Sequence, residues 1–143
     1  MPAVSLIPLF TNRAGQLAAD PTGFLRVHWG RELRQLADTQ ALLEQVIVEL
    51  QRHHWGRILI NQTLMLPFTP AEQQWITADW LPRAVREGSY RHGAVVVSPA
   101  VLVRLATAFV TTNVQGLPLT YRSFDTEADA ERWLRRQPTT AAS

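Results

Sequence analysis

The chain has 143 residues, of which 46% are hydrophobic, with a formal net charge of +2 and no cysteine. This composition predicts a globular protein with a full core, and it excludes disulfides, thiol nucleophiles and thiolate metal sites. We expect a single domain over residues 1–138 and a flexible tail over residues 139–143. Because we find no signal peptide or long apolar span, we expect a cytoplasmic protein without stable membrane insertion.

The basic residues are all arginine, and they are spread from Arg13 to Arg136 without a cluster of four. Codon usage in a GC-rich genome explains an arginine-only set, and anion or nucleic-acid binding is the alternative. A net charge of +2 is a weak electrostatic footprint for nucleic acid. We therefore expect no nucleic-acid partner.

Three strands are predicted in the first 30 residues. Residues 6–12 indicate an edge strand, because Pro8 has no N–H to donate to a neighbouring strand. Residues 16–18 lie between two turn signals and add a short strand. Residues 24–29 alternate in polarity, which is typical of a half-buried strand. We expect residues 6–12 to pair antiparallel with residues 24–29 at a sheet edge.

Two helices and a strand follow. Residues 32–54 predict a helix whose apolar side chains fall in one arc, and Arg57–Asn61 reads as a buried strand. The next helix begins with a complete capping box, with Thr69 as N-cap and Glu72 three residues later, and runs to Gly88. Pro82 lies inside it and should kink it.

The last third of the chain predicts two more strand–helix units. Residues 90–98 form a continuous apolar run, typical of a central strand. The helix that starts at Ser98 has apolar residues over about half its wheel, so we expect it to be deeply packed. Its apolar residues are Val101, Leu102, Leu105, Ala106, Phe109 and Val110. Residues 119–124 form the last strand, and a helix with Ala130, Trp133 and Leu134 facing inward follows.

This order of elements predicts an α/β fold. We expect a mixed sheet of about five strands with right-handed βα units and four helices. The last four long strands should be parallel.

Several stretches of this sequence resemble the bacterial stand-alone STAS-like proteins, relatives of the anti-sigma-factor antagonists, whose fold in turn resembles the CRAL-TRIO lipid-transfer fold. They are FLRVHW at 24–29, ILINQ at 58–62, WLPR at 80–83, AVVV at 94–97, YRSF at 121–124 and AERWL at 130–134. The resemblance implies a STAS-like fold over about residues 24–136. Anti-sigma-factor antagonists carry a phosphorylated serine after an aspartate at the position where this chain has Asn61-Gln62-Thr63. We therefore expect no phosphoswitch, including at Thr63.

No residue set in the sequence predicts a reaction. Neighbouring His53 and His54 are about 100° apart on a helix and cannot readily share a metal ion. The sequence contains none of the Gly-x-Ser-x-Gly, His-Glu-x-x-His or phosphate-loop patterns. We expect a protein that is not an enzyme, with no catalytic residues, no metal site and no cofactor.

One group of polar residues carries a ligand hypothesis. Asn61, Gln62 and Ser98 follow predicted strands, and Thr69 begins a helix. Open α/β sheets bind ligands at the carboxyl ends of their strands, and helix N-termini attract anions. The alternative is that Asn61 and Gln62 only satisfy backbone groups where a strand turns.

A second hypothesis concerns an interface on the helix that begins at Thr69. At 100° per residue, Ile76, Trp80 and Ala84 fall opposite a core-facing stripe that contains Ala71, Trp75, Ala78, Leu81 and Val85. An exposed Trp among polar residues is typical of an interface anchor. The alternative is that the kink at Pro82 or the loop of residues 64–68 covers Trp80.

We therefore expect a non-enzymatic STAS-like binding module that self-associates, as a homodimer, or binds a protein partner. The alternative is a small-molecule or lipid carrier with an apolar pocket between the helices and the sheet.

Overall fold

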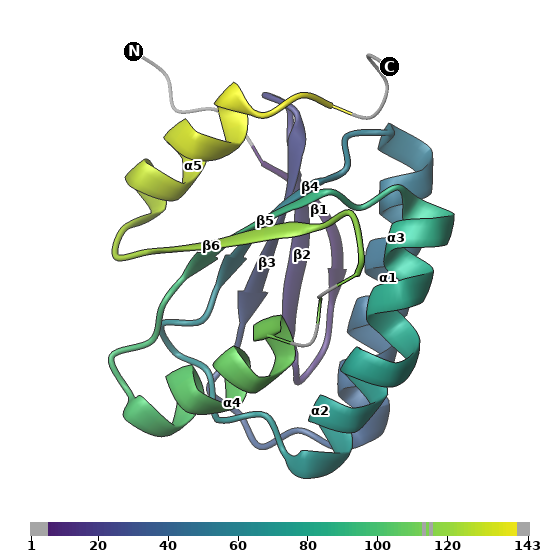
Figure 1. The fold of residues 1–143 in the computed structure, drawn as a ribbon. Helices are drawn as coiled ribbons and strands as arrows, with labels where there is room; N and C mark the ends of the chain where they lie inside the picture. The colour runs from purple at the N-terminus through teal and green to yellow at the C-terminus, as the bar shows by residue number, and fades with distance from the viewer. Residues whose placement is uncertain (1–5, 113, 115, 140–143) are drawn as a thin grey trace.

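The computed structural model of the chain describes residues 6–112, 114 and 116–139. Six strands form one mixed sheet in the order β1-β2-β3-β4-β5-β6 (Figure 1). The strands are β1 (Ile7–Thr11), β2 (Gly15–Asp20), β3 (Phe24–Trp29), β4 (Arg57–Asn61), β5 (His92–Val96) and β6 (Thr120–Phe124). The predicted α/β class is confirmed, with six strands instead of about five. Residues 140–143 of the predicted tail lie outside the described residues.

The first three strands form an antiparallel meander. Strand β1 pairs with β2, and β2 pairs with β3, so the predicted pairing of residues 6–12 with residues 24–29 is wrong. The connections explain this order. Asn12 N–H donates to Gly15 O at 3.0 Å, and Gly23, with φ of +113°, donates to Asp20 O at 2.9 Å. Two such tight turns force each strand to lie beside the next one.

Strands β3 to β6 are parallel, as predicted. The helices are α1 (Leu36–His53), α2 (Pro70–Trp75), the π-helix η1 (Ile76–Trp80), α3 (Leu81–Gly88), α4 (Val101–Thr112) and α5 (Glu127–Arg136). Helices α2, η1 and α3 follow one another without a break, so the four predicted helical segments are present. Helix α5 covers one face of the sheet, and the others lie on the opposite face (Figure 1).

The predicted exposure of Ile76, Trp80 and Ala84 is wrong. All three are buried, and Trp80 is only 4% exposed, with its indole N–H donating to Leu43 O at 2.7 Å. The predicted core-facing stripe is right only in part, since Leu81 and Val85 are buried but Ala71 and Ala78 are exposed. The π-helix is the reason, because it turns less per residue than the 100° of an α-helix. One row of buried residues therefore recurs at every fourth position, and Leu81 and Val85 are buried beside it. The row is Glu72, Ile76, Trp80, Ala84 and Gly88.

The deep packing predicted for α4 is also wrong. Only Val103 and Val110 are buried on this helix, whereas Leu102 is 69% exposed and Leu105 is 62% exposed. Val101 and Phe109 are more than half exposed as well. A helix with apolar residues over half its wheel can bury them all only if neighbours surround that half. Helix α4 faces the sheet on one side only, and a cavity lies between the helix and the sheet.

Candidate functional site

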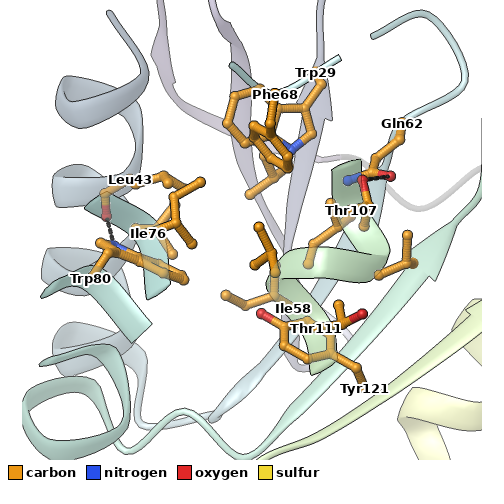
Figure 2. A pocket seen from close by; sticks show the side chains of 15 residues that line it. Trp29, Leu43, Ile58, Gln62, Phe68, Ile76, Trp80, Thr107, Thr111 and Tyr121 are labelled. Atoms are coloured by element: carbon orange, nitrogen blue, oxygen red, sulfur yellow. Dashed lines mark hydrogen bonds between the residues drawn. The ribbon is translucent and has the colours of Figure 1, made fainter. Parts of the chain in front are cut away.

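An apolar cavity lies beneath α4, on the sheet face opposite α5 (Figure 2). Its volume is about 50 Å³. The strands contribute Trp29, Ile58 and Val95 to its wall, and η1 contributes Ile76 and Trp80. Two of the three residues expected at an interface, Ile76 and Trp80, therefore line this cavity.

The cavity continues into a wider cleft of about 340 Å³ between α4 and strands β5 and β6. Five residues line both spaces, namely Gln62, Val95, Thr107, Thr111 and Tyr121. The cleft alone is lined by Arg104, Ala108 and Val114, among others. A volume of this size is at the lower end of the range for small-molecule sites.

Gln62 joins the end of β4 to α4. Its side chain lies beside Thr107 (Figure 2), whose hydroxyl donates to Gln62 Oε1 at 3.0 Å. The backbone N–H of Gln62 donates to Val96 O at 3.0 Å. Gln62 is only 3% exposed, and in the part of the chain that the structure describes its amide Nε2 has no hydrogen-bond partner. This nitrogen is not among the fully buried atoms of the described residues that lack a partner, so its N–H groups are open to the cavity or the cleft.

Tyr121 lines the far wall, and the fully buried Tyr90 lies behind it. The hydroxyls of Tyr90 and Tyr121 are 3.1 Å apart, with Tyr90 donating, and their rings meet edge to face. Burial raises the pKa of both hydroxyls, so both are neutral at ordinary pH. A side chain at Gly93 would overlap the ring of Tyr121 and the hydroxyl of Tyr90, so only glycine leaves room for this pair.

The opposite wall is held by a buried ion pair. The rings of Trp29 and Phe68 meet edge to face at 5.2 Å, and the Arg34 guanidinium lies over both. Arg34 Nε donates to Glu72 Oε2 at 2.6 Å, and the hydroxyl of Thr39 donates to the same oxygen. Because every group in this network is paired, we expect this wall to be rigid.

Of the four predicted ligand-binding residues, the structure brings only Gln62 to the cavity. Asn61 Nδ2 donates to Glu127 Oε2 at 2.7 Å, and Asn61 Oδ1 accepts from Thr63 N–H at 2.9 Å. The hydroxyl of Thr69 caps α2 by accepting from Glu72 N–H at 3.1 Å. Ser98 Oγ accepts from Ala100 N–H at 3.0 Å. These three side chains therefore satisfy groups of the chain itself.

The sequence analysis did not select Trp29, Thr107, Tyr121 or Arg104, although all four line the cavity or the cleft. The signal for two of them was in α4, where Arg104 and Thr107 interrupt an otherwise apolar helix. Tyr121 gave no signal, because it belongs to an ordinary alternating strand.

A second polar network lies on the α5 face of the sheet. The buried Arg26 guanidinium pairs with Asp20 at 2.9 Å, with Glu127 at 3.4 Å and with Glu131. His28 Nε2 is 3.2 Å from Glu127. Within the residues that the structure describes, no three His, Asp or Glu side chains are arranged to hold a metal ion. This network attaches α5 to the sheet.

No family model and no curated protein matches this chain. Among the helices in the described ranges, none is both long enough and apolar enough to span a membrane.

Proposed function

We propose that the protein is a non-enzymatic carrier or sensor that binds a small apolar molecule in the cavity and cleft beneath α4. The observation that carries this proposal is the apolar lining of the cavity. Its walls include Val27, Ile58, Val95, Val110 and the rings of Trp29 and Trp80. Apolar clefts with a few placed polar groups are the usual form of small-molecule sites.

The chemistry of the lining favours binding over catalysis. Among the described residues that line the cavity or the cleft, there is no carboxylate and no imidazole. The tyrosine hydroxyl that lines both is held neutral by its raised pKa. Such a lining supplies contacts and hydrogen bonds, but no general base or activated nucleophile.

Titration with 1-octanol, a neutral apolar probe, tests the proposal. We expect the heat of binding to saturate for the parent protein and for Val48→Phe, because Val48 lies on the exposed side of α1. We expect the variant Val95→Phe, which fills the junction of cavity and cleft, to lose binding at least tenfold while its circular dichroism is unchanged. Equal binding by both variants would overturn the proposal.

Self-association is a second candidate, favoured by the outer face of α4. Val101, Leu102 and Leu105 are exposed on one short helix whose only charged residue is Arg104. Two-fold pairing is the commonest way for a single chain to bury such a patch. A concentration-dependent dimer in sedimentation, lost in Leu105→Glu and kept in Val48→Glu, would support it. A monomer at all concentrations would exclude it.

We also propose that the protein is related to the bacterial STAS-like proteins and that it is cytoplasmic. The strand order supports the kinship, because β3 to β6 lie side by side in sequential order, as the resemblance implies. Thr63 is exposed and its hydroxyl donates to Asn61 Oδ1 at 2.7 Å, and our expectation that it is no phosphoswitch stays a prediction.

A further inference from the structure

Two hydrogen-bond donors line the cavity and the cleft, at different places in the wall (Figure 2). Gln62 Nε2 has no acceptor in the described part of the chain. The Tyr121 hydroxyl accepts from Tyr90, and among the described residues its own hydrogen has no acceptor. Both residues line both spaces. An occupant beside either donor would therefore be held best by an oxygen that accepts hydrogen bonds.

The threonines on α4 do not satisfy these donors. Thr107 donates to Gln62 Oε1, and Thr111 donates to Ala108 O at 3.3 Å, so each hydroxyl hydrogen is already used. Their oxygens keep free lone pairs, which could accept from an alcohol. A lone pair without a donor is better tolerated in proteins than a buried N–H without an acceptor. The unsatisfied Gln62 amide thus decides the polarity of the occupant.

The charge of the lining has one sign. Within the described parts of the chain, Arg104 is the only charged residue that lines either space, and it lines only the cleft. In the described ranges its guanidinium has no ion-pair partner. A single unpaired cation at the open end of an apolar site favours an anionic group there.

We propose that the ligand is a small apolar carboxylic acid, bound as its carboxylate. Its oxygens accept from Gln62 and face Arg104, and its chain points into the cavity. The inner cavity of about 50 Å³ takes only the end of this chain, and the cleft of about 340 Å³ takes the rest. This inference rests on the proposed function and adds the chemical class of the ligand to it.

The test compares octanoate with 1-octanol, which has the same chain length and no charge, by titration calorimetry at one ionic strength. We expect the parent protein to bind octanoate about tenfold more tightly than 1-octanol, as a free amide donor that gains a charged acceptor allows. Arg104→Gln should weaken octanoate binding about three- to fivefold, the range of an exposed ion pair, and leave 1-octanol binding unchanged. The control is Arg122→Gln, which makes the same charge change in a different cleft and should leave both probes unchanged.

A second pair of variants isolates the amide. Gln62→Leu should reduce octanoate binding about tenfold, because it removes the donor. Thr107→Val breaks the same hydrogen bond to Gln62 but keeps the amide, so it should retain the preference for octanoate. If both variants lose that preference alike, Gln62 does not contact the carboxylate, and the inference is wrong.

The remaining outcomes separate the two proposals. Equal affinity of the parent for both probes, or equal weakening of both by Arg104→Gln, would overturn the carboxylate and leave an apolar site. Binding of neither probe would overturn the proposed function, and the carboxylate with it.

Discussion

At the scale of single residues, Glu72 fixes the wall of the cavity. Its carboxylate is buried, accepts from Arg34, Thr39 and the N–H of Thr69, and closes the capping box of α2. Burial alone would raise the pKa of this carboxyl, but these hydrogen bonds and the Arg34 charge outweigh burial. They hold the pKa below the ordinary value of 4.5. One residue therefore links α1, α2 and the loop that carries Arg34.

This lowered pKa predicts how stability depends on pH. Above pH 4.5, Glu72 is ionised in the folded and the unfolded chain, so its full stabilisation is present. As the pH falls from there towards the lower pKa of the folded state, the unfolded chain takes up the proton first. We expect urea denaturation to show the free energy of unfolding falling across this range. Glu72→Gln should flatten that fall and cost about 3 kcal/mol at pH 7.

Glu44→Gln is the matched control for this prediction. Glu44 pairs with Arg83 near the surface, where an ion pair contributes about 0–1 kcal/mol. If the two variants lose equal stability at pH 7, the buried network does not have the role that we give it.

Gly93 gives a second prediction at this scale. A methyl group there would overlap Tyr121 and Tyr90, so Gly93→Ala should cost about 1–3 kcal/mol, as overpacking does. At Gly30 the nearest atom to such a methyl group is 3.7 Å away, so Gly30→Ala should be close to neutral. Thermal unfolding of the two variants checks this, and equal midpoints would contradict it.

At the scale of elements, the sequence predicted what depends on local signals. The capping box at Thr69 and the apolar runs of β4 and β5 are where the sequence placed them. The inward side of η1 could not be predicted, because a wheel of 100° per residue assumes an α-helix throughout. The exposure of α4 could not be predicted either, because apolar residues do not reveal whether they face a packed surface or a cavity.

Two matched substitutions test the positions of η1 and α4. Trp80→Asp should give an unfolded or insoluble protein, since losing a buried aromatic costs about 3–5 kcal/mol. Leu102→Asp should stay folded, with a change within about 0.5 kcal/mol, because Leu102 is exposed. Circular dichroism distinguishes the outcomes, and a folded, soluble Trp80→Asp would refute the burial of Trp80.

Hydrogen exchange tests how firmly α4 is held. Helix α1 buries seven residues and α4 only two, so we expect α4 amides to exchange well before those of α1. An added ligand should slow exchange in α4 and leave α1 unchanged. Equal protection of the two helices without ligand would contradict the loose packing of α4.

At the scale of the whole molecule, the arrangement of the sheet explains why the site was harder to predict than the fold. Strands with buried residues are recognisable one at a time, so β3 to β6 were correctly predicted to be parallel strands of one sheet. The cavity combines Trp29 of β3, Gln62 after β4, Thr107 of α4 and Tyr121 of β6, which are far apart in the sequence. Of these, only Gln62 was selected, because it follows a strand at the carboxyl edge of the sheet.

The central claim is that a small apolar molecule binds between α4 and the sheet. The most direct measurement is nuclear magnetic resonance of the protein saturated with octanoate, with cross-relaxation between ligand methylenes and protein methyl groups. The account predicts contacts to methyl groups of Val95, Thr107 and Val110, and none to Val48 on the outer side of α1. Ligand contacts only to the exposed methyl groups of Leu102 and Leu105, or none to any protein methyl group, would contradict it.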